Sequence, residues 1–151
     1  MSKRAVILLA EDEESDAYFV NMAFKKAGLN HSIAHVSDGQ QLIEYLSGEG
    51  RFADRAKHPM PNLVLLDLKM PRANGLDVLT WLRGRAELKD LPVVVLTSSD
   101  YPGDIEQACK LGAADYRLKP SSPQQLVQFA LDVDANWLKG KSKAQPQRTA
   151  R

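Results

Sequence analysis

Five side chains that could act together in phosphoryl chemistry stand directly after short runs typical of β-strands. They are the acids Glu11, Asp12 and Asp67, the hydroxyl of Thr97 and the ammonium of Lys119. Three carboxylates in one cleft repel one another, and a hard divalent cation with oxygen ligands, for which Mg²⁺ is the natural choice, would relieve that repulsion. A carboxylate beside a cation can attack phosphorus, and a hydroxyl and an ammonium suit the oxygens of the resulting acyl phosphate. The set therefore indicates a Mg²⁺-dependent site where a carboxylate accepts a phosphoryl group.

The clearest of the strand-like runs leads into Asp67. Residues 63–66 are all apolar and lie between turn formers, a pattern typical of a strand buried on both faces of a parallel sheet. Ligands of such sheets bind just beyond the carboxyl ends of the strands, so Asp67 lies where a carboxylate can act. The alternative is that Asp67 only stabilises the following turn, because Asp is common at such positions.

Strand and helix patterns alternate five times along the chain. The sequence predicts strands at residues 5–10, 31–36, 63–67, 91–96 and 114–118. It predicts helices at residues 15–27, from Ser37 to near Gly48, at 76–82, at 102–111, and from Ser122 to about 138; Ser37 opens a Ser-x-x-Gln capping box. This order implies an α/β domain with a parallel sheet, helices on both faces and right-handed crossovers. The carboxyl ends of the strands then share one edge, and they converge on one cleft if the first strand is central.

Each candidate residue also has a simpler interpretation. Thr97 could cap a helix, Lys119 could be a surface lysine, and the acids at residues 11–14 could only favour the start of the next helix electrostatically. One shared site accounts for all five positions at once, and we therefore favour it.

The composition is that of one ordinary globular domain. The chain has 151 residues, of which 44% are hydrophobic and 26% are charged. Its net charge of +1 indicates neither a nucleic-acid nor a membrane partner. The single cysteine, Cys109, excludes an internal disulfide framework and suits a reducing cytosol. No apolar run is long enough to span a bilayer, so we expect a cytoplasmic protein.

Two segments fall outside the alternating pattern. Residues 47–62 contain two glycines and two prolines and are long for a connection, which predicts a short helical turn or a functional loop. Residues 139–151 carry five basic residues, no acid and almost no large apolar side chain, and are predicted to be disordered. The tail would serve solubility or an electrostatic contact with a partner.

Four segments resemble the receiver domain of two-component response regulators. They are ILLAEDE at residues 7–13, LLDLKMP at 65–71 followed by Gly75, VVLTS at 94–98 and GAADYRLKP at 112–120, in the order and spacing of that family. The resemblance covers about residues 5–138 and implies a receiver domain over residues 1–138. It also implies a flavodoxin-like (βα)5 doubly wound fold with the strand order 2-1-3-4-5.

The resemblance also implies a role for each candidate residue. Asp67 would accept the phosphoryl group from a sensor histidine kinase, and Thr97 and Lys119 would bind it. Four groups would hold Mg²⁺, namely the side chains of Glu11, Asp12 and Asp67 and the main-chain carbonyl of Lys69. Thr97 and Tyr116 would form the conformational switch, and the Lys119–Pro120 bond would be cis, as is usual in this family. Glu11 stands where many members have Asp.

Three features resemble a narrower group, the single-domain regulators that work with bacterial phytochromes. These features are the long 47–62 connection, the ending at Trp137 and Leu138, and the lack of an output domain. Members often form homodimers through the fourth helix, fifth strand and fifth helix. The apolar stripe of the last helix could instead face only the core, so Val127 and Leu131, which lie off that stripe, are the better indication of a partner surface.

The resemblance implies a signalling module rather than an enzyme, and three rival interpretations differ in what they require. An aspartyl-phosphate hydrolase typically needs a second acid two residues after the nucleophile, where this chain has Lys69. A receiver-like scaffold that works without phosphorylation does not require Asp67, Thr97 and Lys119 together. A nucleotide-binding module needs a glycine-rich phosphate loop, and none follows the first strand.

Overall fold

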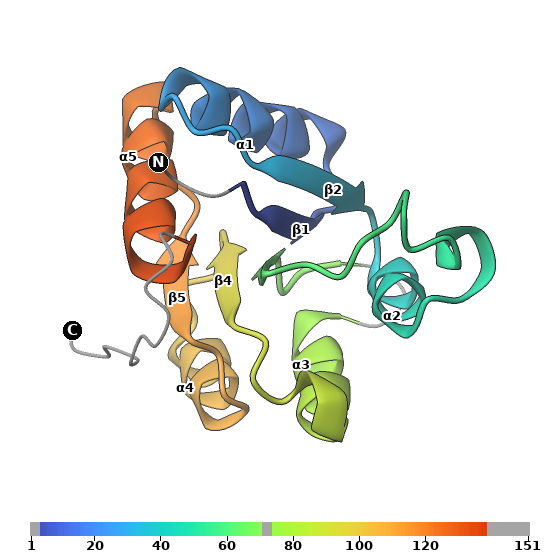
Figure 1. Cartoon of the computed structure of the whole chain (residues 1–151). Helices are drawn as coiled ribbons and strands as arrows, with labels where there is room; N and C mark the ends of the chain where they lie inside the picture. The colour runs from blue at the N-terminus through green and yellow to red at the C-terminus, as the bar shows by residue number, and fades with distance from the viewer. Residues whose placement is uncertain (1–3, 71–73, 139–151) are drawn as a thin grey trace.

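The computed structural model describes residues 4–70 and 74–138, which form an α/β fold around one parallel sheet. The strands in this part of the chain are hydrogen-bonded in the order β2-β1-β3-β4-β5, and helices cover both faces of the sheet (Figure 1). The structure therefore confirms the flavodoxin-like doubly wound fold and its strand order. Because β1 is an inner strand between β2 and β3, its carboxyl end lies beside that of β3.

The five strands are short, and the inner ones are apolar on both faces. They are β1 (Val6–Ala10), β2 (Ser32–Val36), β3 (Leu63–Leu66), β4 (Val93–Thr97) and β5 (Asp115–Leu118). Almost every residue of β1, β3 and β4 is buried, because helices cover both faces of these strands. The predicted ends differ from these by at most two residues; β4 begins after Pro92, whose ring nitrogen cannot donate to the ladder.

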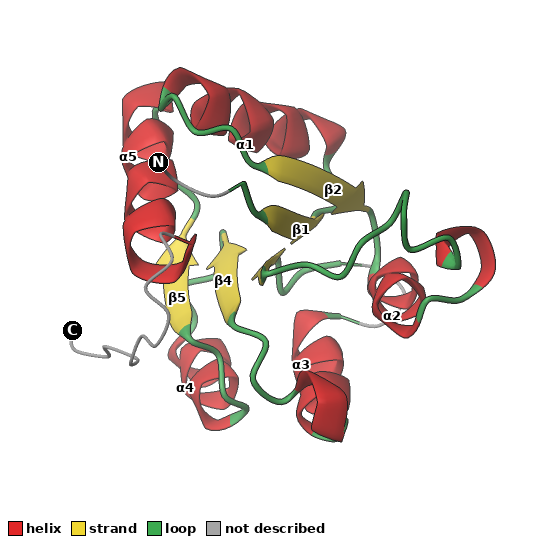
Figure 2. Cartoon of the chain, viewed as in Figure 1, coloured by secondary structure: helices red, strands yellow, loops and turns green. Residues whose placement is uncertain are grey.

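The five helices divide between the two faces of the sheet. They are α1 (Glu14–Lys26), α2 (Gly39–Ser47), α3 (Gly75–Arg83), α4 (Pro102–Lys110) and α5 (Pro123–Val133). Apolar residues of α1 and α5 share one core cluster with the sheet, and those of α2, α3 and α4 share the other. Figure 2 shows the two helix layers in red around the yellow strands. No helix in the described part of the chain is long and apolar enough to cross a membrane.

Helix α2 begins one residue later than the predicted capping box implies, so Ser37 is not the N-cap residue. The cap is Asp38, whose carboxylate accepts a hydrogen bond from the Gln41 N–H at 2.8 Å. The Gln41 side chain reaches back to accept from the Ser37 N–H at 2.9 Å. A carboxylate beside the positive end of a helix is a stronger acceptor than a hydroxyl, which explains why Asp38 takes the cap position.

The long connection between α2 and β3 is packed rather than open. It contains a short 3₁₀ helix, η1 (Gly50–Phe52), which confirms the predicted helical turn. Phe52 is buried, and its ring lies against the rings of Tyr45 and His58, with centroids 5.0 and 5.2 Å away. Arg55 donates to the carbonyls of Tyr45 and His58 at 2.8 and 3.0 Å. The connection therefore continues the packing of α2.

The end of α5 changes from α to π geometry, in the turn η3 (Asp134–Leu138). Within α5, the predicted stripe does face the core, since Ala130 and Val133 are buried. Leu138, the last residue of η3, is also buried and belongs to the same core cluster as these two residues. The predicted disordered tail, residues 139–151, lies outside the described residues.

Candidate functional site

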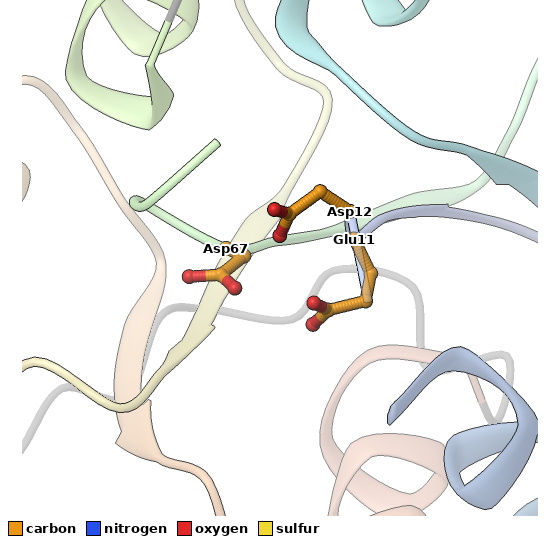
Figure 3. Close-up of side chains that lie close together, drawn as sticks. All are labelled: Glu11, Asp12 and Asp67. Atoms are coloured by element: carbon orange, nitrogen blue, oxygen red, sulfur yellow. The ribbon is translucent and has the colours of Figure 1, made fainter. Parts of the chain in front are cut away.

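Three carboxylates converge where β1 and β3 end. Ala10 and Leu66 are register partners, so the residues that follow them, Glu11 and Asp67, leave the sheet side by side. One oxygen from each of Glu11, Asp12 and Asp67 lies within 4.8 Å of the others (Figure 3). Glu11 and Asp67 are buried, whereas Asp12 is exposed. An all-oxygen donor set this compact fits a hard divalent cation.

Hydrogen bonds fix the backbone around Glu11. Its N–H donates to the Val36 carbonyl at 3.0 Å, and its own carbonyl lies 2.7 Å from His35 Nε2. The Glu13 N–H donates to Glu11 Oε2 at 3.0 Å. Burial raises the pKa of Glu11, and a hydrogen bond from Lys119 opposes that rise. The first acid of the pair is thus held by β2 as well as by its own strand.

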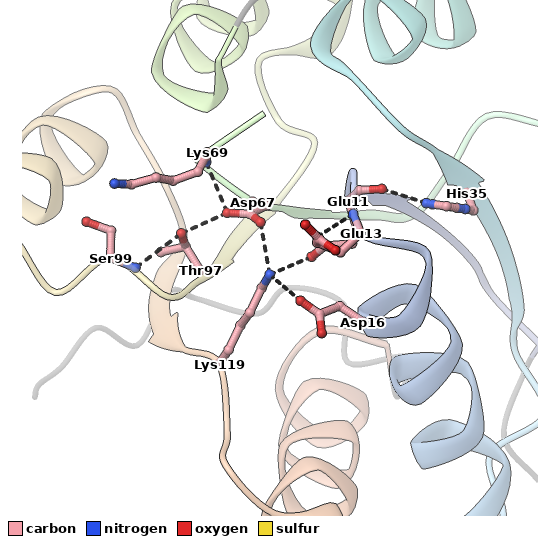
Figure 4. A network of polar contacts seen from close by, with 9 residues as sticks. All are labelled: Glu11, Glu13, Asp16, His35, Asp67, Lys69, Thr97, Ser99 and Lys119. Atoms are coloured by element: carbon pink, nitrogen blue, oxygen red, sulfur yellow. Dashed lines mark hydrogen bonds and ion pairs between the residues drawn. The ribbon is translucent and has the colours of Figure 1, made fainter. Parts of the chain in front are cut away.

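Both oxygens of Asp67 accept hydrogen bonds, from three donors in all (Figure 4). The Thr97 hydroxyl donates to Oδ1 at 2.8 Å, and the Lys69 N–H donates to the same atom at 3.0 Å. Lys119 Nζ donates to Oδ2 at 3.0 Å. Thr97 is the last residue of β4 and is fully buried. The structure thus brings the predicted hydroxyl and ammonium to one carboxylate.

Lys119 contacts three carboxylates, and sequence reasoning missed one of them. Its Nζ lies 2.9 Å from Glu11, 3.0 Å from Asp67 and 2.8 Å from Asp16 in the first turn of α1. Burial alone would lower the pKa of Lys119, but these partners raise it by more, so the pKa lies above its usual value. Asp16 could have been found as a first-turn acid of the helix that starts beside the acid pair.

The second predicted switch residue, Tyr116, is tied to the segment that follows Thr97. Its hydroxyl donates to the Ser99 carbonyl at 2.8 Å, and the Ser99 N–H donates weakly to the Thr97 hydroxyl oxygen at 3.4 Å. The Ser99 hydroxyl donates to Asp104 at 2.7 Å. Ser99 and Asp104 were not predicted as site residues. The geometry links Thr97 to Tyr116 through Ser99, while the switching role of both stays a prediction.

Most of the chain, including the residues of this site, matches one known protein family. Residues 7–131 match the response regulator receiver domain. The chain belongs to the receiver domain family. Receiver domains are signalling domains, and they bind a divalent metal at an acidic site of the kind seen in Figure 3.

Several receiver domains resemble this one over nearly their whole length. Response regulator Rcp1 of Synechocystis sp. is 32% identical over 133 residues, 88% of each chain. Its Mn²⁺-bound structure has a TM-score of 0.79 at 29% identity, covering 95% of this chain and 99% of that one. The phosphorylated cyanobacterial phytochrome response regulator RcpA has a TM-score of 0.83 at 31% identity, covering 97% and 100%. RPA3017, a response regulator in red light signalling of R. palustris, has a TM-score of 0.85 at 32% identity, covering 96% and 99%. The chain therefore lies close to Rcp1 and the phytochrome response regulators.

Two further expectations for this receiver domain concern Lys69 and Pro120. The Lys69 side chain is exposed and leads away from Asp67, so only its main chain faces the acids (Figure 4). Its carbonyl as a metal ligand stays a prediction. The expected cis bond between Lys119 and Pro120 is wrong for this structure, since no peptide bond among residues 4–70 and 74–138 is cis. Trans is the lower-energy form of an X–Pro bond by about 0.5–1 kcal/mol, so proline permits cis without requiring it.

Gly75 packs against the main chain that carries Asp67, which leads to a testable prediction. A Cβ atom on Gly75 would lie 2.6 Å from Leu68 Cα and 2.8 Å from the Asp67 carbonyl oxygen. Because main-chain atoms cannot rotate away, Gly75→Ala should lower the free energy of unfolding by about 2 kcal/mol, as measured by urea denaturation. Gly84→Ala is the matched control, since its Cβ would meet nothing closer than 3.6 Å. Equal losses in the two variants would contradict this explanation.

Proposed function

We propose that this receiver domain is a phosphoacceptor response regulator, in which Asp67 receives a phosphoryl group from the phosphohistidine of a sensor histidine kinase. The observation that carries the proposal is the convergence of Thr97 and Lys119 on the two oxygens of Asp67, beside an acidic pair. The phosphorylated state in which RcpA was determined supports it.

The transfer forms one bond and breaks one. An Asp67 oxygen bonds to phosphorus as the phosphorus–nitrogen bond of the donor breaks, and the donor imidazole leaves with the electron pair. Thr97 and Lys119 donate to the carboxylate oxygens in this structure, and after the transfer they would donate to phosphoryl oxygens instead. Glu11, Asp12, Asp67 and the Lys69 carbonyl would hold Mg²⁺, which would neutralise charge that develops on those oxygens.

The negative charge of the phosphoryl group would change the conformation of the segment around Ser99, which links Thr97 to Tyr116. As Thr97 turns toward the phosphoryl group, its contact with Ser99 changes, and Tyr116 and the start of α4 follow. The output is then a protein contact on the face formed by α4, β5 and α5. This describes a cytoplasmic signalling module rather than an enzyme, with residues 1–138 as the receiver domain and 139–151 as a basic tail.

The partner that we propose is a bacterial phytochrome kinase. Support comes from the relatives, since RcpA is named a phytochrome response regulator and RPA3017 acts in red light signalling. Lys69 at the second position after Asp67 disfavours the hydrolase alternative. The scaffold alternative does not explain why a buried hydroxyl and a lysine both bond to Asp67.

The proposal is tested by the intact mass of the chain after incubation with phosphoramidate and Mg²⁺. We expect the mass of one phosphoryl group to be added, and none to be added when a chelator removes the metal. No adduct with Mg²⁺, together with no binding of beryllofluoride, would overturn the proposal in favour of the scaffold.

We also propose a homodimer through the face of α4, β5 and α5. Two apolar side chains are exposed there, Leu118 in β5 and Leu131 in α5, at 51% and 40%. Such residues on one face are typical of a partner surface. Leu131→Glu should shift the protein to the monomer in size-exclusion chromatography without changing its phosphorylation. Tyr18→Glu, at an exposed aromatic residue of α1, is the control; dimer loss in that variant alone would place the interface on the other side.

A further inference from the structure

The ammonium of Lys119 is held by a residue that none of the proposed roles uses. Asp16 Oδ2 lies 2.8 Å from Lys119 Nζ, the shortest of its three carboxylate contacts, although the residues are 103 positions apart. In Figure 4 the Asp16 side chain reaches from α1 toward Lys119, on the side away from Thr97. The three contacts match the three N–H donors of a lysine ammonium.

The three carboxylates that contact Lys119 differ in whether they can keep that contact during phosphorylation. Glu11 and Asp67 belong to the acidic group that could hold a metal ion, and Asp67 is also the proposed acceptor. Asp16 is outside that group, although it contacts the same ammonium. Asp16 is therefore the carboxylate that can stay with Lys119 when the other two turn to a cation or a phosphoryl group.

A lysine side chain needs a contact that fixes its orientation more than most side chains do. Its charge sits at the end of a flexible four-carbon chain with many rotamers, whereas the start of α1 is fixed by the buried neighbour Ala17. An ion pair as open as this one, with Asp16 40% exposed, adds little to stability. Its effect should therefore appear in the orientation of Lys119.

We propose that Asp16 is a positioning residue, which holds the Lys119 ammonium so that one N–H points at the place where the phosphoryl group binds Asp67. This inference rests on the proposed function. Without the Asp16 contact, the Lys119 ammonium would stay in the site but would occupy several positions. A misplacement of about 1 Å can slow a reaction by up to about 100-fold, so a partial loss of orientation should slow phosphorylation by about 10-fold.

The test compares phosphorylation rates from phosphoramidate, measured by intact mass at saturating Mg²⁺. Asp16→Ala should react about 10-fold more slowly than the wild type. Glu14→Ala removes the same charge from the same helical turn, and it should stay within about twofold because long-range effects of one exposed charge are weak. In a Lys119→Met background, Asp16→Ala should have no additional effect, because both changes act through the same ammonium.

A second readout uses the metal-free protein. The Lys119 ammonium should give a slowly exchanging ¹H–¹⁵N NMR signal in the wild type and in Glu14→Ala, and should lose it in Asp16→Ala. The inference is overturned if Asp16→Ala matches Glu14→Ala in rate, reacts faster than the wild type, or slows the Lys119→Met background equally. A wild type that takes up no phosphoryl group would refute the proposed function instead, and the NMR signal would still decide whether Asp16 fixes Lys119.

Discussion

Asp67→Asn should gain no phosphoryl group under conditions that fully phosphorylate the wild type. Asparagine keeps the shape and one acceptor oxygen, so Thr97 and the Lys69 N–H can still donate to it. The amide lacks the negative charge that makes the carboxylate a nucleophile and a metal ligand. We therefore expect complete loss of the adduct, measured by intact mass after incubation with phosphoramidate and Mg²⁺.

The same variant should fold as well as the wild type. Replacing one of three mutually repelling acids relieves part of their repulsion, and Lys119 keeps Glu11 and Asp16 as partners. The free energy of unfolding should stay within about 1 kcal/mol of the wild-type value. A phosphoryl group found on the variant would assign the acceptor elsewhere, and peptide mapping would then identify it.

Lys119→Met should lower the metal-free stability by about 3 kcal/mol, because breaking a buried ion pair strands its partner charges. Glu11 and Asp67 are both buried, and Lys119 is the cation that contacts them. Methionine fills similar space without the charge, so the loss measures electrostatics rather than a cavity. Urea unfolding in the presence of a chelator gives the value, and Lys57→Met, at an exposed lysine, is the control.

Mg²⁺ should restore much of that stability and should stabilise the variant more than the wild type. In the wild type, a cation at the acids competes with the Lys119 ammonium, which already neutralises them, and Lys119→Met removes that ammonium. A ligand that binds only the folded state stabilises it according to its affinity, so titration with Mg²⁺ followed by urea unfolding measures the difference. A metal-free stability equal to that of Lys57→Met, or a smaller Mg²⁺ effect in Lys119→Met, would contradict this account.

The fold was predictable from the alternation of apolar runs and helix patterns. Periodicity identified all five strands to within two residues at every end, because the inner strands are apolar on both faces. The pattern alone did not give the order in which strands pair, since an apolar run does not specify its neighbours. That order came from the resemblance, and pairing of β1 with both β2 and β3 confirms it.

The sequence predicted which side chains meet where their position along a strand decides it, and missed contacts that depend on how separate elements pack. Glu11, Asp67, Thr97 and Lys119 meet because each lies at the carboxyl end of a parallel strand in one sheet. Asp16 approaches from a helix surface, and its contact with Lys119 depends on how α1 packs. Likewise, the π turn that ends with Leu138 has no simple sequence pattern.

The packed connection between α2 and β3 has a consequence for how this domain is cut and engineered. Arg55 is one of two arginines there, and its guanidinium already donates to the carbonyls of Tyr45, Leu46 and His58. A trypsin-like protease must draw an arginine side chain into its own pocket, which would require these bonds and the rings beside them to come apart first. The length of this segment suggests a flexible loop that a protease could cut or that could accept an inserted reporter domain. At Arg55, however, we expect it to resist cleavage as well as the helix that it follows.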